Sequence, residues 1–104
     1  MRRRRYEILL PLTHNDGQPV NPDLFQQTLN ELVNQFGAIS IAPLSVLGFW
    51  VHQGTRYEDE LRRFTIDVED TPENQQFFAA YKPVLLERFE QIEIYIASFP
   101  VDIL

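Results

Sequence analysis

Two histidines and a short acidic segment are the residues of this chain whose types and spacing could support catalysis. His14 follows the first apolar segment, and His52 stands shortly before Tyr57 and Glu58. A histidine and a carboxylate that meet in a folded protein can serve as general base and general acid. The candidate catalytic residues are therefore His14, His52, Tyr57 and Glu58, and whether the chain is an enzyme depends on how the fold places them.

Metal binding is the second chemistry that these residues suggest, because imidazole and carboxylate groups suit zinc or iron. The chain has two histidines and no cysteine, which excludes disulfides, thiol chemistry and thiolate metal sites. The turn between His52 and Tyr57 has the composition of an exposed loop. We therefore expect these residues to form a solvated rim, with no metal site and no cofactor.

Aromatic residues near the same turn suggest a binding role instead. Trp50 and Tyr57 flank the turn around Gly54 and could pair across a hairpin or form one wall of a binding site. Arg63 and Tyr95 are expected on the uncovered face of the sheet, so the candidate ligand-binding residues are Trp50, Tyr57, Arg63 and Tyr95. The chain has no phosphate-binding glycine loop, nucleophile elbow or dinucleotide fingerprint, and no motif identifies a reaction.

Length and composition limit the class of protein. The 104 residues suit one domain, which we assign to residues 1–104. Hydrophobic residues make up 44% and charged residues 23%, values typical of a soluble globular protein. The apolar runs are much shorter than the roughly 20 residues of a membrane-spanning helix. Together with the absence of cysteine, these features predict a cytoplasmic protein without a membrane partner.

Four consecutive arginines, residues 2–5, precede the first apolar segment. That segment is short and contains Glu7 and Pro11, unlike the apolar region of an export signal. Without these arginines the chain has five basic residues against fifteen acidic ones, and such an acidic surface repels nucleic acid. We therefore expect residues 1–5 to form a flexible basic tail and expect no nucleic-acid partner.

The elements that must position these residues follow from the apolar spacing. A period of two residues indicates strands, and a period of three to four residues indicates helices. The four predicted strands cover residues 6–12, 38–51, 56–70 and 92–99. The two predicted helices cover residues 21–37 and 71–91, and each has a proline at its first position. Pro43 restricts the second strand to a sheet edge, and Pro83 should kink or divide the second helix.

This order of elements predicts a ferredoxin-like βαββαβ fold of the α+β class. Right-handed crossovers give a four-stranded antiparallel sheet in the order 4-1-3-2, with two helices on one face. Strands one and two then run parallel, so their ends form one rim of the sheet. We expect that rim to gather His14, Asp16, His52, Arg56, Tyr57, Glu58, Asp59 and Glu60. Arg56, Arg62 and Arg63 are expected to neutralise the acids of the rim.

Several short patterns also resemble a known group of proteins. They are the NDG loop, the Gly-x-Trp of Gly48 and Trp50, the YEDE segment and the TPEN helix start. The longer segments FGAISIAPLSVLGFW, YEDELRRFTIDVEDTPENQQFF and YKPVLLERFEQIEIYI extend the similarity over nearly the whole chain. They resemble a group of short bacterial, notably cyanobacterial, proteins of uncharacterised function. The resemblance implies the same βαββαβ pattern and no particular activity.

Two classes of function remain. The uncovered sheet face is expected to carry four large apolar side chains, Leu9, Phe49, Leu61 and Tyr95. Their exposure would be unfavourable, so we expect a non-catalytic interaction or regulatory domain that self-associates through its sheet as a homodimer. The alternative is a small enzyme or ligand-binding protein of the dimeric ferredoxin-like barrel type, with a site near His14 or His52. A pocket lined by either histidine would favour this alternative.

Overall fold

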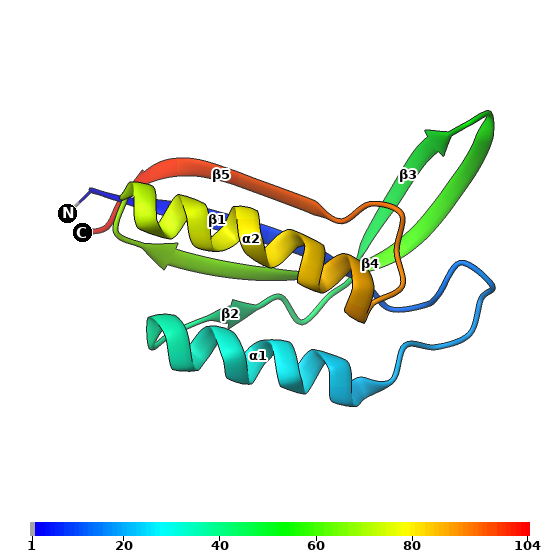
Figure 1. Ribbon diagram of the computed structural model, residues 1–104, viewed down its shortest axis with the longest axis horizontal. Coiled ribbons are helices and arrows are strands. Elements are labelled where there is room, and N and C mark those ends of the chain that lie inside the picture. Colours follow the sequence, from blue (N-terminus) through cyan, green and yellow to red (C-terminus); the bar gives the residue numbers. More distant parts are fainter. Residues whose placement is uncertain (1) are drawn as a thin grey trace.

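The strands and helices follow the predicted order, with one strand more than expected (Figure 1). The computed structural model describes residues 2–104. The elements are β1 (Arg2–Pro11), α1 (Pro22–Phe36), β2 (Ser40–Ile41), β3 (Val46–His52), β4 (Thr55–Val68), α2 (Pro72–Arg88) and β5 (Tyr95–Asp102). All strand pairs are antiparallel, in the order β2-β4-β1-β5 with β3 also paired to β4, so the fold is α+β. Within residues 2–104, neither helix is long and apolar enough to cross a membrane.

The prediction of a four-stranded sheet is wrong, because the expected second strand is divided into β2 and β3. Ile41 of β2 pairs with Phe64, and Val46 of β3 pairs with Leu61. Between these two pairs the chain advances five residues from β2 to β3, while β4 advances only three. The two extra residues lie around Pro43, where the pairing with β4 is interrupted. Proline has no amide hydrogen for the ladder, which explains why the strand is interrupted here.

Residues 2–5, expected to be a flexible tail, form the beginning of β1 and pair with β5. Arg5 makes two hydrogen bonds to Asp67, at 2.7 and 2.9 Å, and Arg4 Nε contacts Asp70 Oδ1 at 2.9 Å. The hydrogen bonds from Arg5 hold the pKa of Asp67 below its usual value. These carboxylates offset the charge repulsion among the arginines, so the segment can join the sheet.

Both helices begin with the predicted capping residues. The side chains of Asn21 and Thr71 accept hydrogen bonds from backbone N–H groups in the first turns of α1 and α2. Pro83 lies inside α2, which nevertheless continues as one helix, so the expected division does not occur. Phe78 and Leu85, on either side of Pro83, are both buried in the core and hold the two halves of the helix in line.

The two helices pack against the same face of the sheet (Figure 1). That face carries alternate residues of β1 and β4, namely Tyr6, Ile8, Leu10, Phe64, Ile66 and Val68. The helices contribute Leu32, Phe78, Tyr81 and Leu85 to the same core. Tyr6 stacks on Phe78 with ring centroids 3.9 Å apart. The intervening residues of β1 and β4 point to the opposite face, which neither helix covers.

The last strand begins later than the sequence predicts. The alternation predicts a strand over residues 92–99, whereas β5 is Tyr95–Asp102, with Tyr95 opposite Leu9. Glu93 Oε1 accepts hydrogen bonds from Lys82 Nζ at 2.8 Å and from the backbone N–H of Ile94 at 2.9 Å. These contacts hold the segment before β5 against α2, away from the ladder.

Candidate functional site

β3 and the first half of β4 form a hairpin that extends beyond the rest of the sheet (Figure 1). β1 pairs with β4 only from Leu61 onward, whereas β3 pairs with β4 from Thr55 to Leu61. The turn residues Gln53 and Gly54 both have positive φ, 51° and 79°, as in the type I′ turns that suit two-residue hairpins. We call residues 46–60 the arm. It contains most of the residues that the sequence analysis selected.

One face of the arm is held together by aromatic packing. Trp50 and Tyr57 lie opposite each other and stack with ring centroids 4.5 Å apart. Trp50 Nε1 donates a hydrogen bond to Asp59 Oδ2 at 2.6 Å. A Cβ atom added to Gly48 would lie 2.9 Å from Leu61 Cδ1, so glycine allows Leu61 to pack directly over the strand. Cross-strand packing therefore accounts for Trp50 and Tyr57 without a ligand.

A groove of about 230 Å³ lies at the base of the arm, next to the start of β5. Its lining includes Leu9, Pro11, Trp50, Leu61, Ile94 and Tyr95, together with Asp59 and Glu93. Of the ligand-binding candidates, Trp50 and Tyr95 line this groove and Tyr57 and Arg63 do not. Arg63 Nε instead lies 3.6 Å from Glu7 Oε2. A groove of this composition suits an apolar side chain or a small apolar molecule.

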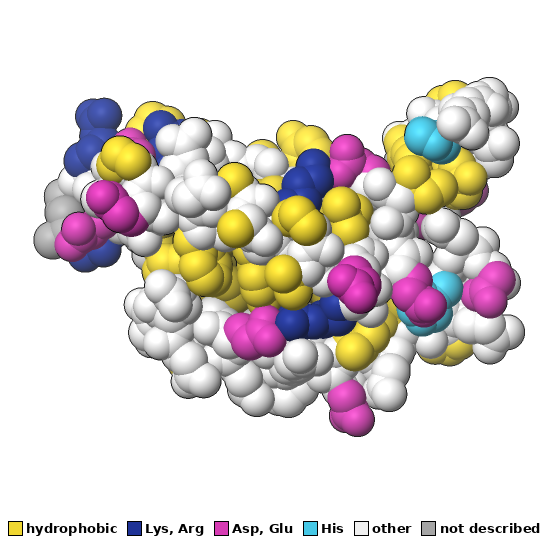
Figure 2. Space-filling view, in the orientation of Figure 1, with side chains coloured by type: hydrophobic (Ala, Val, Ile, Leu, Met, Phe, Trp, Pro, Cys, Tyr) yellow, Lys and Arg dark blue, Asp and Glu magenta, His cyan; other side chains and the backbone are white. Residues whose placement is uncertain are grey.

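The opposite face of the arm exposes a row of apolar side chains. Leu47, Phe49 and Val51 are 63%, 54% and 68% exposed, and we call these three residues the apolar ladder. The guanidinium carbon of Arg56 lies 5.2 Å from the centre of the Phe49 ring. Figure 2 shows apolar side chains on the arm, apart from the apolar side chains between the two helices. The ladder is thus a surface feature separate from the core.

The expectation that Phe49 shares a sheet face with Leu9, Leu61 and Tyr95 is wrong. Gly48 pairs with Asp59 and Val46 pairs with Leu61, so these residues share one face of the arm. Phe49 is the intervening residue and points to the other face, because successive side chains of a strand alternate.

The two histidines lie in different surroundings. His14 borders a shallow groove with Arg56, Tyr57 and Glu58, whereas His52 pairs with Thr55 at the tip of the arm. The rim therefore brings together three of the catalytic candidates, His14, Tyr57 and Glu58, and leaves His52 outside this group. Asp59 also borders the groove, whereas Asp16 and Glu60 do not.

His14 has an unusual environment of its own. Its Nδ1 atom is buried, lies 3.7 Å from Glu90 Oε2 and makes no hydrogen bond with any described residue. Glu90 lies in the turn that follows α2, so this contact does not involve the acidic segment of β4. Among residues 2–104 there is no group of three His, Asp or Glu side chains that could hold a metal ion.

The arginines near the acidic segment do not neutralise it as expected. Arg62 Nη1 donates hydrogen bonds to the carbonyl oxygens of Ala42 and Pro43, at 3.1 and 3.0 Å. Arg56 lies over Phe49, and Arg63 faces Glu7. The acids have other neighbours: Ser45 Oγ donates to Glu60 Oε1 at 3.0 Å, and Asp59 accepts from Trp50. The hairpin places Arg56 beside the Phe49 ring, and the loop at Pro43 supplies the carbonyl oxygens that Arg62 binds, so these arginines contact groups other than the acids.

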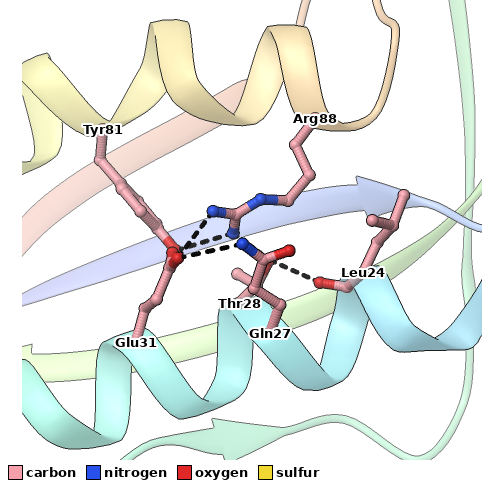
Figure 3. A network of polar contacts seen from close by, with 6 residues as sticks. All are labelled: Leu24, Gln27, Thr28, Glu31, Tyr81 and Arg88. Carbon is pink, nitrogen blue, oxygen red and sulfur yellow. Dashed lines mark hydrogen bonds and ion pairs between the residues drawn. The ribbon is translucent and has the colours of Figure 1, made fainter.

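A polar network between α1 and α2 was not predicted (Figure 3). Arg88 reaches from α2 to α1, where it donates to Thr28 Oγ1 and to Glu31 Oε2, both at 2.8 Å. Tyr81 OH donates to Glu31 Oε1 at 2.7 Å. Thr28 Oγ1 in turn donates to the carbonyl oxygen of Leu24 at 2.8 Å. We call this network, formed by Thr28, Glu31, Tyr81 and Arg88, the interhelical clamp.

The clamp changes the acidity of its members. Burial and the hydrogen bond to Glu31 raise the pKa of Tyr81 to about 12. Burial alone would raise the pKa of Glu31, but the hydrogen bonds from Tyr81 and Arg88 outweigh it and lower that pKa. The sequence signal for the clamp was spacing along each helix. Tyr81 and Arg88 are seven residues apart and share one face of α2, and Thr28 and Glu31 are three residues apart and share one face of α1. With every group of the clamp bonded inside the protein, a structural role accounts for it.

Comparison with known proteins gave no relative. No family model, no curated protein and no solved structure matches this chain.

Proposed function

We propose that this chain is a small non-catalytic interaction domain that associates with a second copy of itself through its sheet. The observation that carries the proposal is the apolar ladder, in which Leu47, Phe49 and Val51 remain more than half exposed on a projecting arm. Burial of apolar surface contributes about 25 cal/mol per Å². Covering three such side chains therefore favours association, and an exposed contiguous apolar patch commonly marks an interaction site.

We further propose that the domain is a ferredoxin-like βαββαβ variant. In support, β2 and β3 together take the place of a single second strand beside β4, and β1 lies between β4 and β5. A sheet of this kind has helices on one face only. The other face, together with the arm, remains available to a partner.

Binding of a small apolar molecule is the second candidate function. The groove of about 230 Å³ at the base of the arm favours it. Neither His14 nor His52 lines that groove, so the acid-base chemistry of the enzyme alternative has no support there. We therefore place the interaction domain first.

Sedimentation velocity of the full chain across the micromolar range tests the proposal. We expect the sedimentation coefficient to rise with concentration for the unchanged chain and to stay at the monomer value for Val51→Lys, which places a charge in the ladder. Leu44→Lys is the matched control, because Leu44 is 80% exposed and lies outside β3. A monomer at every concentration of the unchanged chain would remove the proposal.

A further inference from the structure

The edges of the sheet differ in how they are protected from pairing. Within the described residues, β3 pairs on one side only, as do β5 at the far edge and the largely charged residues 55–59 of β4 in the arm, and β2 contains two residues. Edge strands commonly avoid further pairing by being very short or by carrying proline, lysine or a bulge. β5 contains Pro100, whereas β3 contains neither proline nor lysine. β3 is therefore the edge best suited to receive another strand.

The direction of the backbone groups of β3 follows from its turn. His52 and Thr55 flank the two-residue turn and pair across it, so their backbones are hydrogen-bonded to each other. Backbone N–H and C=O groups then alternate in direction along the strand. Leu47, Phe49 and Val51 consequently direct their backbone groups away from β4. The residues of the apolar ladder thus also carry the free donors and acceptors of the edge.

We propose that two copies join their β3 strands antiparallel, with Phe49 of one copy opposite Phe49 of the second copy. The proposal rests on the self-association proposed above and adds its surface and register. Centring on Phe49 overlaps all seven residues of β3 and places Leu47 opposite Val51 of the second copy. Every outward-directed residue then meets another outward-directed residue, and each such pair exchanges two backbone hydrogen bonds.

Side chains on both faces fit this register. On the exposed face, the apolar ladder meets its own copy in reverse order, so the three side chains of each copy lie beside apolar side chains of the second copy and lose part of their exposure. On the opposite face, Trp50 lies opposite Gly48 of the second copy, so the largest side chain of β3 meets the position that has none. β3 contains no Asp, Glu, Lys or Arg, so the contact places no like-charged side chains directly opposite each other across the two β3 strands.

Introduced cysteines test the register, because the chain has no cysteine and any disulfide must join the introduced residues. In Phe49→Cys, the two Cα atoms would lie about 5.5 Å apart across a hydrogen-bonded pair, a separation that a disulfide can bridge. In the control Leu47→Cys, the equivalent atoms would lie about 14 Å apart, four residues along the strands. Under mild oxidation we expect Phe49→Cys to form about tenfold more covalent dimer than Leu47→Cys.

A second variant keeps Phe49 in place, in case its loss weakens association. The double variant Leu47→Cys/Val51→Cys places cysteines opposite each other twice in the proposed register. Within one copy the two cysteines are about 13 Å apart along the strand and cannot join. We expect the double variant to form a covalent dimer, whereas Val51→Cys alone should not.

The outcomes separate this inference from the proposed function. A concentration-dependent dimer that the double variant does not cross-link would overturn the register and leave self-association standing. Equal cross-linking of Phe49→Cys and Leu47→Cys would also overturn it, because random collisions would explain both. A monomer throughout the sedimentation series would remove both proposals together.

Discussion

Replacing Arg88 by methionine is the most direct test of the interhelical clamp. The Arg88 side chain is 9% exposed and donates to Thr28 Oγ1 and Glu31 Oε2, both at 2.8 Å. Methionine retains much of the apolar length but supplies no donor. Hydrogen bonds to charged groups contribute about 1.5–3 kcal/mol, and Glu31, whose side chain is 38% exposed, can recover part of its hydration. We expect a loss of about 2 kcal/mol in the free energy of unfolding.

Urea unfolding of Arg88→Met, Glu31→Gln and the double variant measures this loss and its origin. If the two side chains act on each other, the double variant should lose about 1 kcal/mol less than the sum of the single losses. Arg2→Met is the matched control, because Arg2 pairs with Asp102 and both side chains are about two-thirds exposed. We expect it to change stability by less than about 0.5 kcal/mol. A loss for Arg88→Met no larger than that of the control, or fully additive losses, would refute the clamp.

Three further predictions concern Tyr81, Gly48 and the core. The pKa of Tyr81 rises from 10.0 to about 12 on folding, so its contribution to stability is complete below pH 10.0 and is lost as the pH rises through about 12. Urea melts of Tyr81→Phe should show a shallower decline over this range, and an unchanged decline would contradict the assignment. Gly48→Ala should cost less than about 1 kcal/mol in urea melts, because its Cβ would meet only the terminal methyl of the Leu61 side chain, Cδ1 at 2.9 Å, which can shift; a larger loss would contradict this freedom of Leu61. Ile66→Ala should lower the free energy of unfolding by about 2–5 kcal/mol, since Ile66 is fully buried, whereas Leu44→Ala should change it little, and similar losses for both would contradict the core assignment.

The helices could be predicted because their signals are local. Asn21 and Thr71 cap backbone groups that lie only two or three residues away, and the following prolines fit the first turn without distortion. The buried faces of β1 and β4 were likewise predictable, since the alternation of apolar residues fixes which side chains share a face. The candidate site was less predictable. His14 and Tyr57 do border one groove, whereas His52 lies at the tip of the arm, and the separation depends on how far the hairpin extends.

The amino-acid sequence by itself determined the number of helices, their starting points, the α+β class and the apolar faces of β1 and β4. The tertiary structure decided which segments meet. Arg4 and Arg5 join the sheet because carboxylates 66 and 62 residues away along the chain lie beside them. Pro43 interrupts the edge strand between β2 and β3. Only the pairing register of β3 with β4 makes β3 extend beyond the sheet as part of the arm. Local signals act through neighbouring backbone groups, whereas charge pairing and strand register depend on residues that only folding brings within hydrogen-bonding distance.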